Sequence, residues 1–238
     1  MARPTAPPAS GCWTTGDAAP LAGLLGPAVS VVEAFTDDEQ PTLLAGERSL
    51  VSGAIPSRVA EFTSARRCAR DALAALGSPP VPILSGPHRE PLWPTGIVGS
   101  ITHCLGYRAA AVAPASGGRA LGIDAEPNLP LPDGVLDIVA RPDERAAVAL
   151  LTDAVPDVAW DRLLFSAKES VYKAWFPVTG TWLGFEDAEI SVGDGTFVVS
   201  IDAPRPCLAA APAPQVMMGR WTFHVERQLL LTCVARSE

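Results

Sequence analysis

The sequence predicts an α+β fold, and three observations support this. Two segments, 56–76 and 160–176, carry apolar residues at helical spacing, and the chain from Phe185 onward is a run of short β-type segments. With 238 residues, 48% of them hydrophobic and 18% charged, the chain can bury a substantial core. The 24 Pro and 20 Gly indicate many turns. This length suits one large domain or two small lobes.

The N-terminal half has local signals for each of its elements. Residues 1–20 are rich in Pro, Ala, Thr and Gly, which predicts a loose leader. A helix is expected over 56–76, because Pro56 suits a first turn and Gly77 suits a helix end. A Pro-rich connector, 81–95, follows it. Short apolar runs predict strands over 29–36, 96–104, 107–114 and 120–127.

The C-terminal half contains the clearest helix of the chain. Segment 160–176, WDRLLFSAKESVYKAWF, has apolar residues every three or four positions, and Pro177 is expected to end it. A shorter helix is expected over 143–151. Asp194-Gly195 is a hairpin signal between two apolar runs. Antiparallel strands are expected over 185–193, 195–201, 220–227 and 228–235, with a Pro/Ala-rich loop at 203–215.

The composition of the chain limits which partners it can bind and in which cellular compartment it is expected. The net charge of −8 argues against nucleic acid, because phosphate backbones bind basic surfaces. No stretch approaches the roughly 18 apolar residues of a membrane helix. The N-terminus is a poor signal peptide, which favours a cytoplasmic protein with reduced thiols. The odd number of cysteines and the absence of a CxxC spacing argue against a disulfide framework and a zinc knuckle. The five cysteines are Cys12, Cys68, Cys104, Cys207 and Cys233.

Several common motifs are missing from the sequence. It has no GxxxxGK[ST], no GxSxG, no GxGxxG and no HExxH. A P-loop, a nucleophile elbow, a dinucleotide fingerprint and a zinc-protease helix are therefore excluded as explanations.

The strongest local feature is the pair Asp124 and Glu126 in LGIDAEP, at the end of a predicted buried strand. Residues two apart on a strand point to the same face, so the two carboxylates lie side by side. Oxygen ligands of this kind suit Mg²⁺, completed by water and substrate phosphate. The alternative is a solvent-facing pair at a strand end. The apolar residues just before the pair, Leu121–Ile123, argue against this alternative.

The second feature is the pair Glu169 and Lys173 on the predicted helix 160–176. Four residues apart, they share a helix face, and alone they are an ordinary surface pair. Glu169 could instead supply a third carboxylate to the metal, with Lys173 beside it to hold a phosphate or a leaving group.

Cationic groups for an anionic ligand gather earlier in the chain. His103, after the strand that contains Ser100 and Thr102, could contact a phosphate, or could be a structural histidine. Over 47–70, five arginines face two glutamates, which gives a local charge of +3 in a chain of net charge −8. The alternative for the arginines is a solvated helix face. They are Arg48, Arg58, Arg66, Arg67 and Arg70.

Together and in this order, the pieces resemble the 4′-phosphopantetheinyl transferase superfamily. The closer match is to the branch that activates peptide, siderophore and polyketide synthases of secondary metabolism. The family pairs a GID-x-E strand with an F-[ST]-x-K-E-[SA]-x-x-K helix, and here Glu169 follows Asp124 by 45 residues. The matching stretches are ARRCARDALAALG (65–77), GPHREPLWPTGIVGSITHC (86–104), LGIDAEP (121–127) and WDRLLFSAKESVYKAW (160–175).

The resemblance implies two α/β lobes related by a pseudo-twofold axis, with the active site in the cleft between them. It places an N-terminal lobe at 21–115 and a C-terminal lobe at 116–238, joined near ASGGR (115–119). Smaller relatives have one lobe per chain and form trimers, so this chain resembles the fused, monomeric type.

The resemblance also implies a reaction. The phosphopantetheine arm of coenzyme A moves to a serine of an apo acyl or peptidyl carrier protein, and adenosine 3′,5′-bisphosphate leaves. Mg²⁺ would be bound by Asp124, Glu126 and Glu169. Glu169 is the expected general base, Lys173 would contact the phosphates and assist the leaving group, and His103 with Thr102 would bind phosphate oxygens.

Arginines would hold the remaining phosphates of the coenzyme. Arg66 and Arg89 match arginines of the family's motifs, whereas the match of Arg48 and Arg58 is looser. Ala65 stands where the family often has Gly. Asp143 and Glu144 are interpreted as a helix N-terminus without a catalytic role, and exposed apolar residues within 175–183 are a candidate carrier-docking patch.

Two other functions use the same residues. A Mg²⁺-dependent nucleotide phosphohydrolase would need the three carboxylates but no carrier protein. A CoA-binding module without activity would need only the cations, although the joint presence of Asp124, Glu126, Glu169 and Lys173 argues against it. Metal-dependent transfer to a serine separates the three hypotheses.

Overall fold

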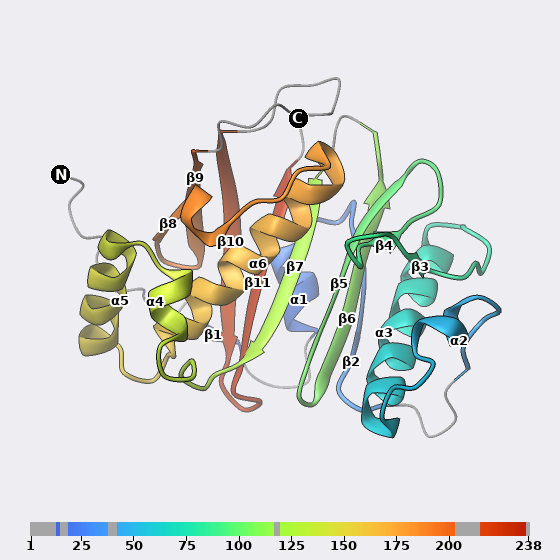
Figure 1. The fold of residues 1–238 in the computed structure, drawn as a ribbon, viewed down its shortest axis with the longest axis horizontal. Helices are drawn as coiled ribbons and strands as arrows, with labels where there is room; N and C mark the ends of the chain where they lie inside the picture. Colours follow the sequence, from blue (N-terminus) through green and yellow to red (C-terminus); the bar gives the residue numbers. More distant parts are fainter. Residues whose placement is uncertain (1–12, 15–18, 38–41, 117–119, 203–214, 237–238) are drawn as a thin grey trace.

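A computed structural model describes residues 13–14, 19–37, 42–116, 120–202 and 215–236. Its mixture of helices and antiparallel strands confirms the α+β class. Two halves lie side by side, each with a long helix across a sheet (Figure 1). None of the helices in the described part is long and apolar enough to cross a membrane.

The N-terminal half is a three-stranded antiparallel sheet, in the order β2-β6-β5, covered by helix α3. Ala69 and Leu73 of α3 pack on Ala110 and Val112 of β6, all fully buried. A hairpin of two short strands, β3 and β4, lies beside this sheet. The elements are α1 (Pro20–Leu24), β2 (Ser30–Ala34), α2 (Glu47–Leu50), α3 (Pro56–Ala75), β3 (Leu84–Ser85), β4 (Pro91–Leu92), β5 (Ile97–Cys104) and β6 (Tyr107–Pro114).

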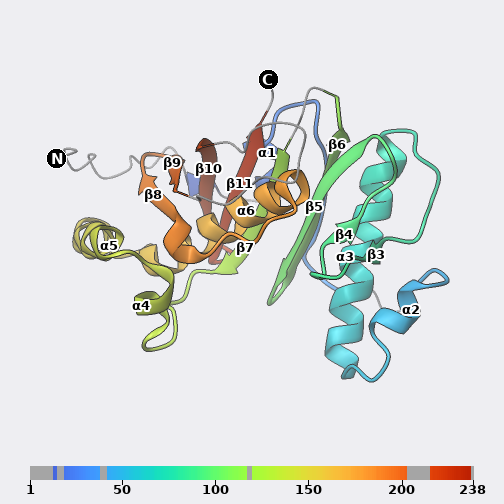
Figure 2. The same cartoon turned by 45° about the horizontal axis from the view of Figure 1, so that its top comes forward.

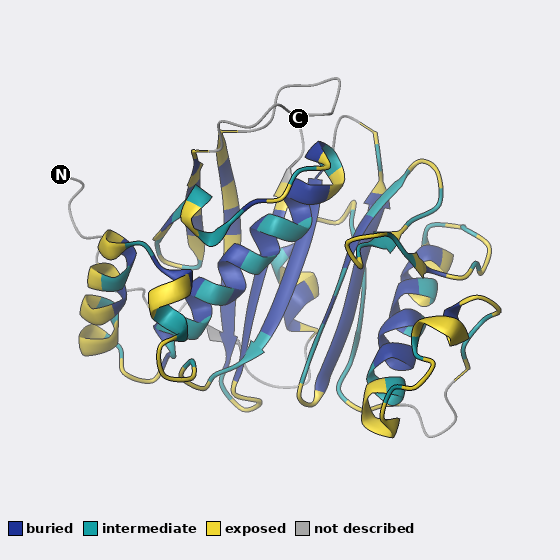
Figure 3. Ribbon diagram, in the orientation of Figure 1, coloured by how far each residue is buried: buried dark blue, intermediate teal, exposed yellow. Residues whose placement is uncertain are grey.

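The C-terminal half is an antiparallel sheet in the order β7-β11-β10-β9-β8, with the short strand β1 paired in parallel to β10. Helix α6 lies across β7 and β11, and its apolar face is buried in the largest core (Figure 3). The elements are β1 (Trp13–Thr14), β7 (Ala120–Pro127), α4 (Val135–Val139), α5 (Pro142–Ala154), α6 (Trp160–Thr179), the 3-10 turn η2 (Phe185–Asp187), β8 (Ala188–Val192), β9 (Thr196–Ile201), β10 (Val216–His224) and β11 (Leu229–Arg236).

The two halves meet where β5 lies next to β7, as the views in Figure 1 and Figure 2 both show. Side-chain hydroxyls hold this seam. Ser100 Oγ accepts a hydrogen bond from Ile123 N at 3.1 Å, and Thr102 Oγ1 accepts one from Ala125 N at 3.1 Å. Both hydroxyl groups are on buried residues, so each satisfies a backbone donor that water cannot reach.

The structure corrects some of the expected element ends. Pro177 does not end helix α6, which continues to Thr179 and closes with Gly180 N bonded to Phe176 O at 2.8 Å. A proline this near the end removes one hydrogen bond and leaves the helix intact up to the left-handed Gly180. The connector 81–95 contains the β3–β4 hairpin. The expected loop 203–215 lies, except for its last residue, outside the described residues.

The division into lobes at 115–119 stays a prediction. Residues 117–119 lie outside the described part, and β6 and β7 flank them. Of the expected leader 1–20, the described residues are the strand β1 and the start of α1.

Candidate active site

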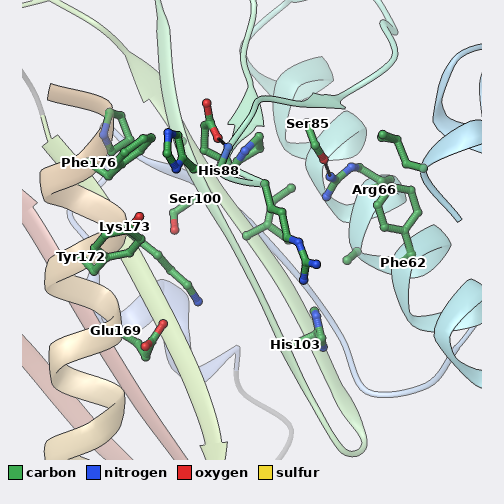
Figure 4. A pocket seen from close by; sticks show the side chains of 18 of the residues that line it. Phe62, Arg66, Ser85, His88, Ser100, His103, Glu169, Tyr172, Lys173 and Phe176 are labelled. Atoms are coloured by element: carbon green, nitrogen blue, oxygen red, sulfur yellow. Dashed lines mark hydrogen bonds between the residues drawn. The ribbon is translucent and has the colours of Figure 1, made fainter. Parts of the chain in front are cut away.

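A pocket of about 580 Å³ lies between the two halves. Its walls are α3, the segment 85–91, strand β5 and helix α6 (Figure 4). Four permanent cations and His103 line it, against the carboxylates of Glu90 and Glu169, in a chain whose net charge is −8. The cations are Arg58, Arg66, Arg89 and Lys173. The pocket therefore suits an anionic ligand.

Arg58 and His103 face each other on the N-terminal wall. Arg58 Nη1 is 2.8 Å from His103 Nε2, and it also reaches Glu61 at 3.3 Å. Burial, followed by the charge of Arg58, lowers the pKa of His103. The imidazole is therefore mostly neutral at pH 7, when it can still bind a phosphate oxygen through one N–H.

Arg66 is built into the same wall. Its Nε donates to Ile83 O at 2.9 Å, its Nη2 donates to Ser85 Oγ at 3.3 Å, and its guanidinium lies over the Phe62 ring. Burial lowers its pKa to about 10, so it stays charged at neutral pH. A fixed planar guanidinium of this kind can present its remaining N–H groups to a phosphate.

Asp124 lies at the seam between the halves and is 5% exposed. Its Oδ1 accepts hydrogen bonds from Lys173 Nζ at 2.7 Å and from Thr102 Oγ1 at 3.1 Å. Among the described residues, its Oδ2 is buried without a hydrogen-bond partner. A buried carboxylate oxygen left unpaired is costly, which marks this atom as a place for a ligand.

Glu126 points from the same face of β7 to another part of α6. Its Oε2 accepts a hydrogen bond from Arg162 Nη1 at 3.1 Å. Burial and the neighbouring charge of Asp124 raise the pKa of Glu126 to about 7, and Arg162 counters part of this shift. The two carboxylates thus repel each other.

Glu169 and Lys173 project from α6 into the pocket (Figure 4). Burial, and then the charge of Asp124, raise the pKa of Glu169, so this carboxylate takes up a proton more readily than an exposed glutamate does. Lys173 Nζ bonds to Asp124 and, at 3.2 Å, to Ile123 O. These hydrogen bonds connect Lys173 to strand β7, so Glu169 and Lys173 are not simply an ordinary ion pair on a helix surface.

Gly122 explains why α6 lies so close to these carboxylates. A Cβ at this position would overlap Ser170 O and would lie 2.7 Å from Ala174 N. The glycine of the GID motif thus lets the helix backbone lie directly on β7. Gly122, Asp124 and Glu126 share one face of the strand, so the contact point and both carboxylates face α6.

The donor chemistry of the carboxylates fits a divalent cation. Among the described residues, no three His, Cys, Asp or Glu side chains already stand grouped around a metal position. The unpaired Asp124 Oδ2, with Glu126 on the same strand face and Glu169 on the facing helix, nevertheless supplies hard oxygen donors next to the cationic pocket.

Other sequence candidates lie apart from the pocket. Arg48 is exposed on α2 and is not among the residues that line it. Arg70 pairs with the fully buried Glu47 at 2.9 Å and so serves the fold, whereas Arg67 forms an exposed pair with Asp71 at 3.7 Å on the surface of α3. In the suggested docking segment 175–183, the expected apolar exposure is confined mainly to Trp182, which is 60% exposed; Trp175, Phe176 and Leu183 are buried.

Asp143 and Glu144 lie in the first turn of α5, as expected. Glu144 is also the partner of Lys168, whose Nζ donates to Glu144 Oε2 at 2.7 Å, to Phe185 O at 2.8 Å and to Ala188 O at 2.9 Å. This pair is buried, away from the pocket lining.

Three aromatic or imidazole groups of the pocket were not expected from the sequence. Tyr172 and Phe176 line it one turn apart on α6, and the His88 ring lies against that of Phe176 with centroids 5.0 Å apart and the ring planes tilted by 60°. Tyr172 and Phe176 follow Glu169 by three and seven positions, so helical spacing alone could have identified them. His88 could not be found this way, because it comes from the other half of the molecule.

The fold and the site define an α+β enzyme with a cationic pocket beside a group of carboxylates. Residues 46–113 match the 4′-phosphopantetheinyl transferase N-terminal domain, and residues 120–211 match the 4′-phosphopantetheinyl transferase superfamily. The chain belongs to the 4′-phosphopantetheinyl transferase superfamily.

Curated relatives agree over most of their length. The chain is 49% identical to the 4′-phosphopantetheinyl transferase Svp of Streptomyces mobaraensis, over 90% of this chain and 88% of that protein. It is 46% identical to the 4′-phosphopantetheinyl transferase PptT of Mycobacterium tuberculosis, over 87% and 91% of the two chains. It is 44% identical to the 4′-phosphopantetheinyl transferase Npt of Nocardia iowensis, over 79% and 87%.

Proposed function

We propose that this enzyme transfers the 4′-phosphopantetheine arm of coenzyme A to a serine of an apo acyl or peptidyl carrier protein, and releases adenosine 3′,5′-bisphosphate. The observation that carries the proposal is the pocket in which Arg58, Arg66 and Arg89 face Glu169 and Lys173 across the two halves. It combines cations that can bind phosphate with the half-buried carboxylate of Glu169, which can act as a general base.

Cations of the N-terminal wall bind the phosphates of coenzyme A. Arg66 and Arg58 offer guanidinium N–H groups, and His103 offers an imidazole N–H, all on one side of the pocket. Arg89, which is exposed and has a φ of 68°, is held at the rim by the β3–β4 hairpin. Tyr172 and Phe176 give the opposite wall an apolar surface for the pantetheine chain.

Asp124, Glu126 and Glu169 would hold Mg²⁺. When bound, the cation would neutralise charge that develops on the pyrophosphate as its bond to the leaving group breaks. Thr102 holds Asp124 Oδ1 and so keeps Oδ2 directed away from the seam hydroxyl.

The remaining steps belong to the protein. Glu169 accepts the hydroxyl proton of the carrier serine, whose oxygen forms a bond to the β-phosphorus of the coenzyme. The bond between this phosphorus and the bridging oxygen breaks, and adenosine 3′,5′-bisphosphate departs with the bonding electrons. Lys173 lines the same pocket and stabilises the charge on the leaving phosphate.

The carrier protein approaches from the solvent side of this pocket, and one copy of the chain holds all the proposed groups. We therefore propose that the enzyme acts as a monomer. Among the described cysteines, Cys68, Cys104 and Cys233, none is joined in a disulfide, which suits the cytoplasm as the place where coenzyme A and apo carriers meet.

The test is intact-mass spectrometry of apo carrier proteins after incubation with the full chain, coenzyme A and Mg²⁺. A mass gain of one phosphopantetheine, lost with EDTA and absent from a carrier whose acceptor serine is replaced by alanine, is the expected result. Binding of coenzyme A without any mass gain would support a non-catalytic module. Breakdown of coenzyme A without carrier labelling would support a phosphohydrolase.

A further inference from the structure

The role of Arg162 is explained neither by the packing of the fold nor by the proposed reaction. It lies in the first turn of α6, seven positions before Glu169, and therefore on the same helix face two turns away. Its side chain is only 17% exposed. It does not line the pocket, so it does not touch the coenzyme site directly.

The guanidinium of Arg162 uses three of its N–H groups. Nε donates to Leu129 O at 3.0 Å and Nη2 donates to Pro130 O at 2.8 Å, both in the loop after β7. Nη1 donates to Glu126 Oε2 at 3.1 Å. Two bonds to backbone carbonyls hold the planar group in place without the help of Glu126.

The same loop is tied to the start of α6 by other contacts. Asp161 Oδ2 accepts a hydrogen bond from Leu131 N at 2.8 Å, and Asn128 Oδ1 accepts one from Ala159 N at 2.7 Å. The anchor for Arg162 is therefore part of a rigid junction. A group fixed in this way can hold one oxygen of Glu126 and leave the other oxygen to a second ligand.

We propose that Arg162 is a positioning residue for the metal site: it holds Glu126 through Oε2 and presents Oε1 to the divalent cation. The inference rests on the proposed function, because Glu126 is a metal ligand only there. Hydrogen-bonded partners of ligating carboxylates orient them and raise metal affinity. Arg162 thus acts through Glu126 and makes no contact with coenzyme A.

Mn²⁺ binding to the full chain, followed by the electron paramagnetic resonance signal of free Mn²⁺, tests the proposal without any turnover. Arg162→Gln is expected to weaken Mn²⁺ binding by ~10–100-fold. Arg162→Lys is expected to weaken it as well, because one ammonium group cannot reproduce a planar fork with three acceptors. Arg145→Gln is the matched control, since Arg145 pairs with Asp137 at 3.1 Å away from the carboxylates, and it is expected to bind as the unsubstituted chain does.

A double-mutant cycle with Glu126→Gln identifies the route of the effect. If Arg162 acts through Glu126, adding Arg162→Gln to the Glu126→Gln chain changes Mn²⁺ affinity no further. Circular dichroism of each variant confirms that it is folded, and Arg162→Lys carries the test if Arg162→Gln does not fold.

Three outcomes would overturn the inference while leaving the proposed function standing: unchanged Mn²⁺ affinity in both Arg162 variants, tighter binding, or additive effects in the cycle. Tighter binding would show that Arg162 competes with the metal for Glu126. A chain that binds no Mn²⁺ at all would overturn both the inference and the metal part of the proposed function.

Discussion

At the scale of single residues, the site depends on carboxylates that are kept partly out of water. Burial raises the pKa values of Glu126 and Glu169, and the charge of Asp124 adds to both shifts. Lys173 and Arg162 each neutralise one carboxylate of β7. Carboxylates and cationic side chains therefore lie next to one another between β7 and α6. Because the carboxylates have raised pKa values, an additional cation would bind readily in this region.

Replacement of Glu169 by Gln is expected to lower kcat by ~10²–10⁴-fold, because the carrier serine then has no base. The acidic limb of the pH profile is expected to reflect Glu169 together with the proposed metal ligand Glu126, whose pKa is raised to about 7. Since the pKa of Glu169 is raised, the rate is expected to increase with pH above the range where an ordinary glutamate ionises. Added Mg²⁺ should move this limb to lower pH, because a cation favours the carboxylate form.

The measurement is kcat/KM against pH at low and high Mg²⁺, using the mass-spectrometric transfer assay. Glu169→Asp serves as the control that keeps the charge and shortens the side chain. Full activity of Glu169→Gln, or a limb that Mg²⁺ leaves unmoved, would contradict the role of Glu169 as a metal-linked base.

At the scale of elements, helix α6 serves two surfaces. One face carries Glu169, Tyr172, Lys173 and Phe176 to the pocket, and another carries Lys168 into a buried junction with α5, η2 and β8. Glu144 receives Lys168 and, through Oε1, the amide of Ile190 at 2.7 Å. Lys168 and Glu169 are neighbours in sequence, yet one builds the fold and the other lines the site.

Lys168→Met is expected to destabilise the protein by about 3–5 kcal/mol, because it leaves the Glu144 carboxylate buried without its cation. The double variant Lys168→Met with Glu144→Gln is expected to recover part of this loss, since no unpaired charge is then buried. Urea unfolding of the three chains measures the effect. Equal stability of Lys168→Met and the unsubstituted chain would mean that the pair contributes nothing to folding.

At the scale of the whole molecule, the candidate active site is formed where the two halves are joined. The N-terminal half supplies Arg58, Arg66 and His103, and the C-terminal half supplies Glu169 and Lys173. Hydroxyl groups of Ser100 and Thr102 connect β5 to β7 at this point. The position of Arg58 and Arg66 relative to Glu169 therefore depends on the contact between β5 and β7.

The variant Thr102→Val keeps the side-chain shape but removes the hydroxyl that accepts Ala125 N and donates to Asp124 Oδ1. It is expected to cost about 1–3 kcal/mol of stability, because a buried N–H loses its partner. Transfer activity should fall as well, since Asp124 loses a fixed contact. Urea unfolding and the transfer assay measure the two effects.

Thr152→Val is the matched control for the seam. Its hydroxyl bonds to Val148 O at 2.9 Å within α5, far in the fold from β5 and β7, and transfer activity should be unchanged. A Thr102→Val chain as stable and active as this control would show that the seam does not depend on the hydroxyl.

The sequence by itself determined the long helices, most strands and the order of the chemical groups. Helical spacing identified α6, and strand alternation placed Asp124 and Glu126 on one face, because these patterns follow from local backbone geometry. The family, too, could be inferred from the motifs at 121–127 and 160–175. Local signals were weaker where a proline stood near a helix end, and Pro177 was wrongly expected to end α6.

Only the tertiary structure decided which of these groups act together. It separated Arg58 and Arg66, in the pocket, from Arg67 and Arg70, which pair with acids elsewhere, although all four lie on one helix. It brought His88 to Phe176 and Arg162 to Glu126. The reason is that a side chain's partner is set by the packing of distant segments, which the spacing of residues along one element does not encode.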